Sequence, residues 1–161
     1  MTDDVNSKLD EIFNARAERL AAATHAQLEN EKKQDAVFEE FLVLKASVIR
    51  PALDALSRKL ADRGHGSKVF ETQAGDRPDG DKQEIGIRFR LDAGAHFGRG
   101  NEYPHLTLSF DKSARKVQFY RCTMSPGKGG MAGSDGSADF DSLTEDLINQ
   151  KALKVIAEVF K

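Results

Sequence analysis

The sequence of 161 residues has one cysteine, four prolines and no long apolar run. The single cysteine, Cys122, excludes a disulfide within the chain. A membrane-spanning helix needs about 20 consecutive apolar residues, and no stretch of this sequence approaches that length, so we expect no membrane anchor. The first residues, MTDDVNSKLDE, are acidic and lack an apolar run. We therefore expect no secretory signal and a cytoplasmic protein.

An excess of charge of one sign is also lacking. The chain has 24 Lys and Arg against 26 Asp and Glu, for a formal net charge of −2. Residues 66–126 carry ten basic and eight acidic side chains, far from the basic excess of a domain that binds phosphate backbones. The composition therefore argues against nucleic acid as the partner.

Glycine and proline are absent from Val5 to Arg50, and good helix formers dominate this segment. Residues spaced alternately four and three apart form one face, which we call the heptad face: Leu9, Phe13, Arg16, Leu20, Ala23, Gln27, Asn30, Gln34, Val37, Phe41, Leu44 and Val48. Because its centre is polar, two interpretations compete: one continuous helix, or a helical hairpin turning within residues 29–35. A turn without glycine or proline is unusual, so we favour the continuous helix. Pro51 predicts a kink or a new helix start.

The first half of this helical segment has only a thin apolar stripe. Most helix stability comes from burying an apolar face, so such a helix is unstable alone. The pattern predicts association with a second copy of the chain or with a helical protein partner. We expect the association helix to include Val37, Phe41, Leu44 and Val48.

After residue 66 the apolar period changes from helical to alternating. Alternation around residues 85–91, 106–110 and 117–120, with a shorter segment at 68–73, predicts four strands. Sequential strands usually pair, so we expect a four-stranded antiparallel meander.

The last residues predict a helix that packs on the sheet. The sequence Ser142-Leu143-Thr144-Glu145 fits a capping box, and an apolar stripe then runs to the C-terminus. We expect an α+β protein, with a long amphipathic, coiled-coil-like helical region at residues 1–65. Residues 66–161 then form the antiparallel sheet with the C-terminal helix packed on it.

Two glycine-rich loops, residues 93–104 and 127–140, would emerge at the same end of a meander. They suggest a ligand-binding or enzymatic α+β domain, in which the candidate ligand-binding residues are His96, Arg99, His105 and Lys128. The sequence does not match the phosphate-loop pattern, because Lys128 is followed by glycine and not by a helix. Histidine spacing does not match a metal site. We expect no metal and no cofactor, and no residue is assigned a catalytic role.

The polar face of the sheet provides a further alternative. Alternation places Arg88, Arg90 and Tyr120 on the face opposite the core. Sheets that bind RNA by stacking need two or three exposed aromatics, and only Tyr120 qualifies here. We favour a non-enzymatic interaction or adaptor protein that self-associates through its N-terminal helices, with ligand binding at the loops and nucleic acid on this face as alternatives.

Overall fold

The computed structural model describes residues 2–73, 75–76, 82–83, 85–92, 103–124 and 130–161. The chain divides into two compact units, with the boundary between Val37 and Phe38. We call residues 38–161 the body. The first unit consists of the N-terminal part of one helix, and the body holds the end of that helix and every other element.

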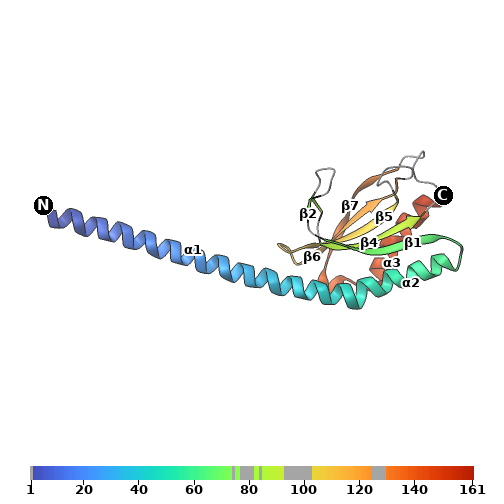
Figure 1. Ribbon diagram of the computed structural model, residues 1–161, viewed down its shortest axis with the longest axis horizontal. Coiled ribbons are helices and arrows are strands. Elements are labelled where there is room, and N and C mark those ends of the chain that lie inside the picture. Colours follow the sequence, from blue (N-terminus) through green and yellow to red (C-terminus); the bar gives the residue numbers. More distant parts are fainter. Residues whose placement is uncertain (1, 74, 77–81, 84, 93–102, 125–129) are drawn as a thin grey trace. The chain divides into compact units, whose positions relative to one another are not determined.

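Helix α1 (Thr2–Leu44) is continuous through residues 29–35, so the hairpin interpretation is wrong and the long helix is confirmed. One π turn, η1 (Lys45–Ile49), joins it to α2 (Arg50–Ala61) (Figure 1). The amide of Arg50 donates to the carbonyl of Lys45, five residues back. Proline has no amide hydrogen and clashes with the preceding turn, which explains why Pro51 lies in the first turn of a new helix.

The sheet has five strands in the order β1-β4-β5-β6-β7, all antiparallel. Their bounds are β1 (Gly66–Thr72), β4 (Gly86–Asp92), β5 (His105–Asp111), β6 (Lys116–Cys122) and β7 (Ala132–Asp139). The expected count of four strands is therefore wrong. Strand β7 is rich in Gly, Ser and Asp and shows no alternation of apolar residues. It lies at the edge of the sheet and buries only Ala138 (8% exposed), so it needs no apolar face.

A second, two-stranded ladder lies in the segment between β1 and β4. Strands β2 (Gly75–Asp76) and β3 (Lys82–Gln83) pair antiparallel. Each is two residues long, too short to show any alternation of apolar and polar residues.

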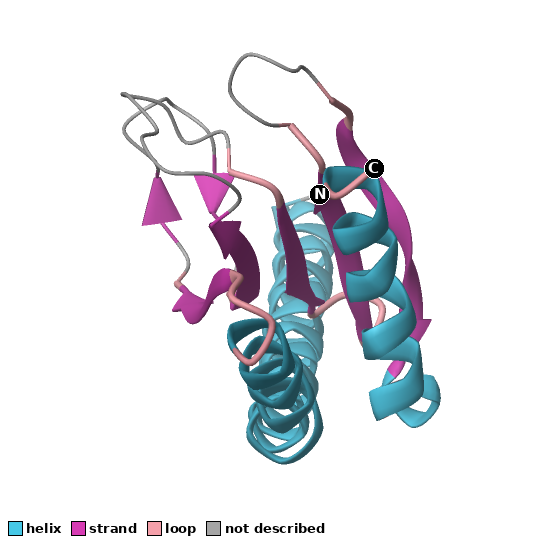
Figure 2. Cartoon of the chain, turned by 90° about the vertical axis from the view of Figure 1, so that its right-hand side faces the viewer, coloured by secondary structure: helices cyan, strands magenta, loops and turns pink. Residues whose placement is uncertain are grey.

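Helices α2 and α3 (Glu145–Val159) cover one face of the five-stranded sheet (Figures 1 and 2). This arrangement follows from the alternation along β4, β5 and β6, since an apolar sheet face must be covered by another layer. The core between the layers consists of fully buried side chains from both: Phe41, Ile49, Leu53, Ile87, Phe89, Leu91, Leu106, Leu108, Val117, Phe119, Ile148 and Val155. The α+β architecture with a C-terminal helix on the sheet is confirmed.

The start of α3 differs from the expected capping box. Ser142 belongs to the short 3-10 turn η2 (Phe140–Ser142), and Thr144 is the N-cap. Its hydroxyl oxygen accepts from the amide of Leu147 at 3.2 Å. Phe140 and Leu143 are both buried, so the chain is held against the core by these two side chains before the helix begins.

Candidate functional site

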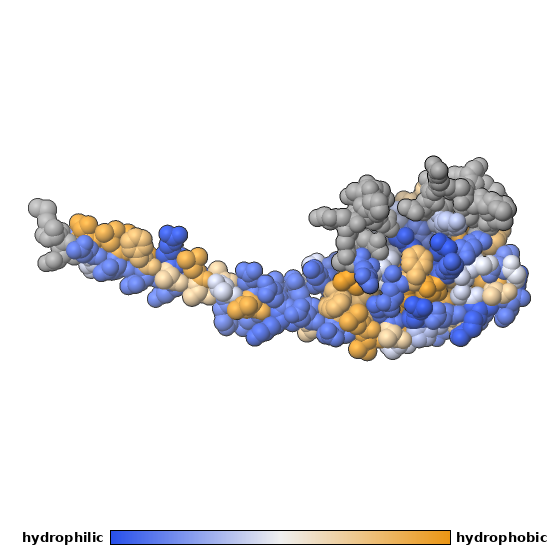
Figure 3. Space-filling view, in the orientation of Figure 1, coloured by the Kyte–Doolittle hydropathy of each residue, from blue (hydrophilic) through white to orange (hydrophobic). Residues whose placement is uncertain are grey.

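Residues 2–37 of α1 carry one candidate surface, which we call the N-terminal apolar stripe. Its members lie three, four or seven residues from one another on one helical face and are all exposed: Val5 57%, Leu9 43%, Ile12 60%, Phe13 59% and Leu20 58%. Figure 3 shows exposed apolar side chains, in orange, along this part of the helix. The unit is a single helix, so it has no second layer of its own to cover them.

Several polar side chains elsewhere on this helix pair with a residue one turn away. Lys8 pairs with Asp4 one turn away at 2.9 Å, and Gln27 donates to Glu31 at 3.3 Å. Such pairs stabilise a helix by only a few tenths of a kcal/mol each. They support the helical conformation of the segment and leave its apolar stripe exposed.

The heptad face changes character where the chain enters the body. Of the four residues expected in the association helix, Val37, Leu44 and Val48 are half-buried, whereas Phe41 is completely buried. The Phe41 ring stacks on Phe110 of β5 with centroids 5.0 Å apart. Phe41 therefore belongs to the core of the body, and the exposed part of the heptad face lies nearer the N-terminus.

An ion-pair cluster fixes the end of α1 to the sheet within the body. Arg115, in the β5–β6 turn, donates to Glu40 from Nε at 2.9 Å and also from a terminal nitrogen. Its guanidinium lies 3.6 Å from the Asp141 carboxylate and 5.3 Å from the centroid of the Phe140 ring. The hydrogen bond to Glu40 raises the pKa of Arg115 above its usual value. Arg115 has φ 50°, a left-handed conformation that is rare outside glycine.

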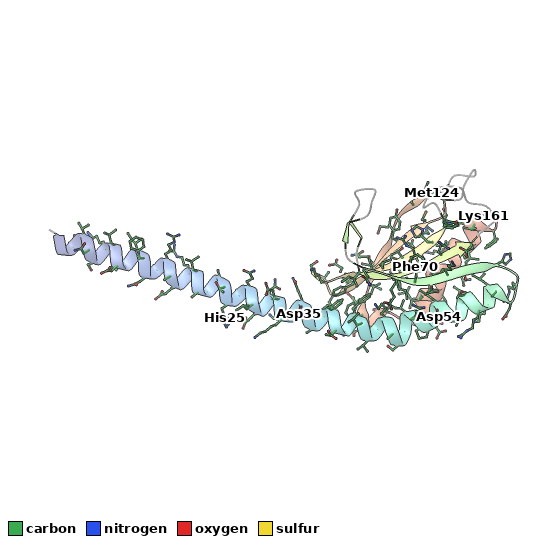
Figure 4. All side chains as sticks on the ribbon, in the orientation of Figure 1. His25, Asp35, Asp54, Phe70, Met124 and Lys161 are labelled. Carbon is green, nitrogen blue, oxygen red and sulfur yellow. The ribbon has the colours of Figure 1, made fainter. Side chains whose placement is uncertain are left out.

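The polar face of the sheet is the second candidate surface. Cross-strand register aligns Phe70, Arg88, Thr107 and Tyr120 in one row across four strands. Arg88 Nε donates to Thr107 at 2.9 Å, and its guanidinium lies 6.0 Å from the Phe70 ring; Figure 4 labels Phe70 on β1. The register therefore places Arg88 and Tyr120 in one row with Phe70 and Thr107.

The neighbouring row places a second arginine against an aromatic ring. Arg90 lies 4.5 Å from the centroid of Tyr103 and pairs with Asp92 at 3.0 Å. His105 is 8% exposed, and its Nδ1 lies 2.8 Å from the carbonyl of Tyr103. The ring of His105 lies 6.0 Å from that of Tyr120. This face therefore combines cations and rings, although Asp92 offsets the charge of Arg90.

The proposed loop site falls mostly on residues that the structure does not describe. His96, Arg99 and Lys128 lie outside the described residues, and His105 lies in β5 on the polar face.

In the described part of the chain, no group of three or more His, Cys, Asp or Glu could hold a metal ion. Within the same residues, no helix has the length and apolar character needed to cross a membrane. Cys122 is a free, buried thiol.

The sequence did not indicate one largely buried ion pair, whose side chains are 17% and 13% exposed. Lys151 of α3 lies 3.3 Å from the Asp135 carboxylate, donates to the Asp135 carbonyl, and sits 5.2 Å from the Phe119 ring. The β6–β7 register shifts between Gln118 and Tyr120, and this irregularity lies opposite Asp135. No local sequence pattern indicates that Lys151 and Asp135 pair across 16 residues.

Comparisons of the chain with protein-family models, with curated proteins and with solved structures found no match.

Proposed function

We propose that this protein is a small interaction protein that self-associates through the N-terminal apolar stripe of α1. One observation carries the proposal: five large apolar side chains of one helical face are 43–60% exposed in a unit that consists of that helix alone. Exposed apolar surface that is contiguous and bordered by polar residues is typical of interaction sites. A second copy is the partner that supplies the same stripe.

The body supports this proposal because it has a core of its own. Its sheet face is covered by α2 and α3, and Phe41 is completely buried and stacks on Phe110. The exposed side chains of the stripe belong to the other unit. We also propose a cytoplasmic location, supported by the lone free cysteine, since small secreted proteins commonly use disulfides.

The stripe is short, so we expect a reversible dimer whose population depends on protein concentration. Sedimentation equilibrium from about 1 µM upward covers the range in which such contacts bind. The wild-type chain should shift from monomer toward dimer across this range.

Introducing negative charge into the stripe tests this surface directly. The double variant Leu9→Glu/Phe13→Glu should remain monomeric, because burying carboxylates between two helices costs more than the contact returns. Leu28→Glu is the matched control: Leu28 is 52% exposed on the same helix but lies to one side of the stripe. Glutamate is a good helix former, so at a concentration where the wild type is monomeric the circular dichroism of both variants should match that of the wild type. A dimer that survives the double variant would exclude this surface.

Binding of an anionic, ring-containing ligand on the polar sheet face is a second candidate function. The pairing of Arg88 with Phe70 and of Arg90 with Tyr103 supports it, because guanidinium groups and aromatic rings together hold single-stranded nucleic acid. Binding of a fluorescent single-stranded oligonucleotide should weaken with salt and be lost in Arg88→Glu/Arg90→Glu. If the double variant binds as the wild type does, this candidate is excluded.

A further inference from the structure

We infer that the two copies of α1 pair antiparallel, in a register that places Leu9 against the partner's Leu20. This inference rests on the proposed self-association and adds its geometry. It follows from the position of Arg16 on the heptad face and from the acidic residues near the start of the helix.

Four successive positions of the heptad face lie within the stretch covered by the stripe, at spacings of four, three and four: Leu9, Phe13, Arg16 and Leu20. All four are exposed on α1. A pair of helices that uses a heptad seam packs these positions layer upon layer. The orientation of the second helix decides what meets Arg16.

A parallel, in-register pair would place Arg16 against the partner's Arg16. Two guanidinium groups would then face each other between apolar layers, where like charges are destabilising. Among the described residues, no carboxylate is paired with Arg16 to offset this repulsion.

An antiparallel pair centred between residues 14 and 15 removes the conflict. Leu9 then meets the partner's Leu20, and Phe13 meets the partner's Arg16. The second contact places a guanidinium against an aromatic ring, which is a favourable arrangement. Moving the partner by one heptad would instead pair Leu20 with Thr2 or with Arg16, so the central register makes the better use of the apolar side chains.

The distribution of charge along the helix favours the same orientation. Residues 3–11 contain four carboxylates and the single cation Lys8, which already pairs with Asp4. A parallel pair would bring both acidic ends together. An antiparallel pair sets each acidic end at the level of the partner's residues 18–26, which contain one carboxylate, Glu18, and the cation Arg19, so the long-range interaction is less repulsive.

Cross-linking with a short bis-maleimide distinguishes the two orientations. In the antiparallel register Asn6 lies in one layer with the partner's Ala23, and both positions are exposed. We compare Asn6→Cys, Ala23→Cys and the double variant in the full chain, with the wild type as the blank because Cys122 is buried. The double variant should give covalent dimer, and each single variant should give only the background of the wild type.

Cross-linking of either single variant would show a parallel pair and overturn the inference. A dimer by sedimentation that no variant cross-links would overturn the register. A wild-type chain that stays monomeric would instead remove the proposed self-association itself, so the two failures are distinguishable.

The substitution Arg16→Gln provides an independent readout of opposite sign. In the antiparallel pair it removes the contact with Phe13, and the dissociation constant should rise severalfold. In a parallel pair it would remove a repulsion between two arginines. A dissociation constant that falls would therefore overturn the inference.

Discussion

Phe13 and Phe41 occupy equivalent heptad positions on the same helix but have opposite environments. Phe13 is 59% exposed, and Phe41 is completely buried against the ring of Phe110. The sequence pattern is the same at both positions. What differs is whether the body supplies a second layer. The comparison shows that heptad spacing identifies a face that needs covering, and that the rest of the chain decides what covers it.

The largest expected effect comes from truncating the two phenylalanines in parallel. Phe41→Ala should lower the free energy of unfolding by about 3–5 kcal/mol, because it leaves a cavity among buried rings. Phe13→Ala should change the unfolding of the body by no more than about 0.5 kcal/mol. Urea denaturation at low protein concentration measures both. Equal losses would contradict the separation of roles between the two positions.

The buried ion pair of the body should show the next largest effect. Asp135→Ala removes the carboxylate partner of Lys151, whose side chain is 17% exposed, and should cost about 2–3 kcal/mol because a charge is left buried. The double variant Asp135→Ala/Lys151→Met should recover part of this loss. Thermal and urea unfolding of the wild type, the two single variants and the double variant give the coupling energy between Asp135 and Lys151. A coupling energy near zero would show that the pair does not stabilise the body.

A smaller loss is expected at the ion-pair cluster that fixes the end of α1. Arg115→Ala should lower the melting temperature by less than Asp135→Ala does, because the Arg115 side chain is 42% exposed and solvent screens its pairs.

Arg115→Gly provides the matched comparison. It also removes the pair with Glu40 but relieves the left-handed backbone at φ 50°. The glycine variant should therefore melt at a higher temperature than the alanine variant. The reverse order would argue against backbone strain at this turn.

The smallest effect is a pH dependence at Asp111. Hydrogen bonds from Ser113, and then from Gln118 and the Ala114 amide, hold the pKa of Asp111 below its ordinary value of 3.8. The folded state therefore favours the carboxylate. Its contribution is present above the ordinary pKa and is lost as pH falls through the lowered pKa.

Melting temperatures of the wild type and of Asp111→Asn should thus converge as pH falls from about 5 to about 2. At neutral pH the variant should be slightly less stable. A difference that does not change over this range would show that the Asp111 carboxylate adds no pH-dependent stability.

Strong periodicity made much of the fold predictable. A regularly spaced apolar face marks the long helix, the central strands β4, β5 and β6, and the C-terminal helix. Such spacing can be read directly from the sequence. Strand β7 was missed because its Gly, Ser and Asp residues pair by backbone hydrogen bonds at a sheet edge and bury almost nothing. The start of α3 was misplaced because Ser142 and Thr144 are both acceptable caps, and packing of Phe140 and Leu143 decides between them.

The candidate surface was predictable in kind but not in extent. Spacing alone could not separate Phe41, which is completely buried, from Leu9 and Phe13, which are exposed. Contacts between distant parts of the chain were out of reach for the same reason. Nothing local to Glu40 or Arg115 indicates that they pair across 75 residues.

Amide hydrogen exchange on the full chain at two protein concentrations tests the central claim most directly, because it reports on both regions in one measurement. Association through the stripe predicts that residues 5–24 exchange more slowly at the higher concentration, while the exchange of β4, β5 and β6 stays the same. Exchange of residues 5–24 that is fast and independent of concentration would contradict the account.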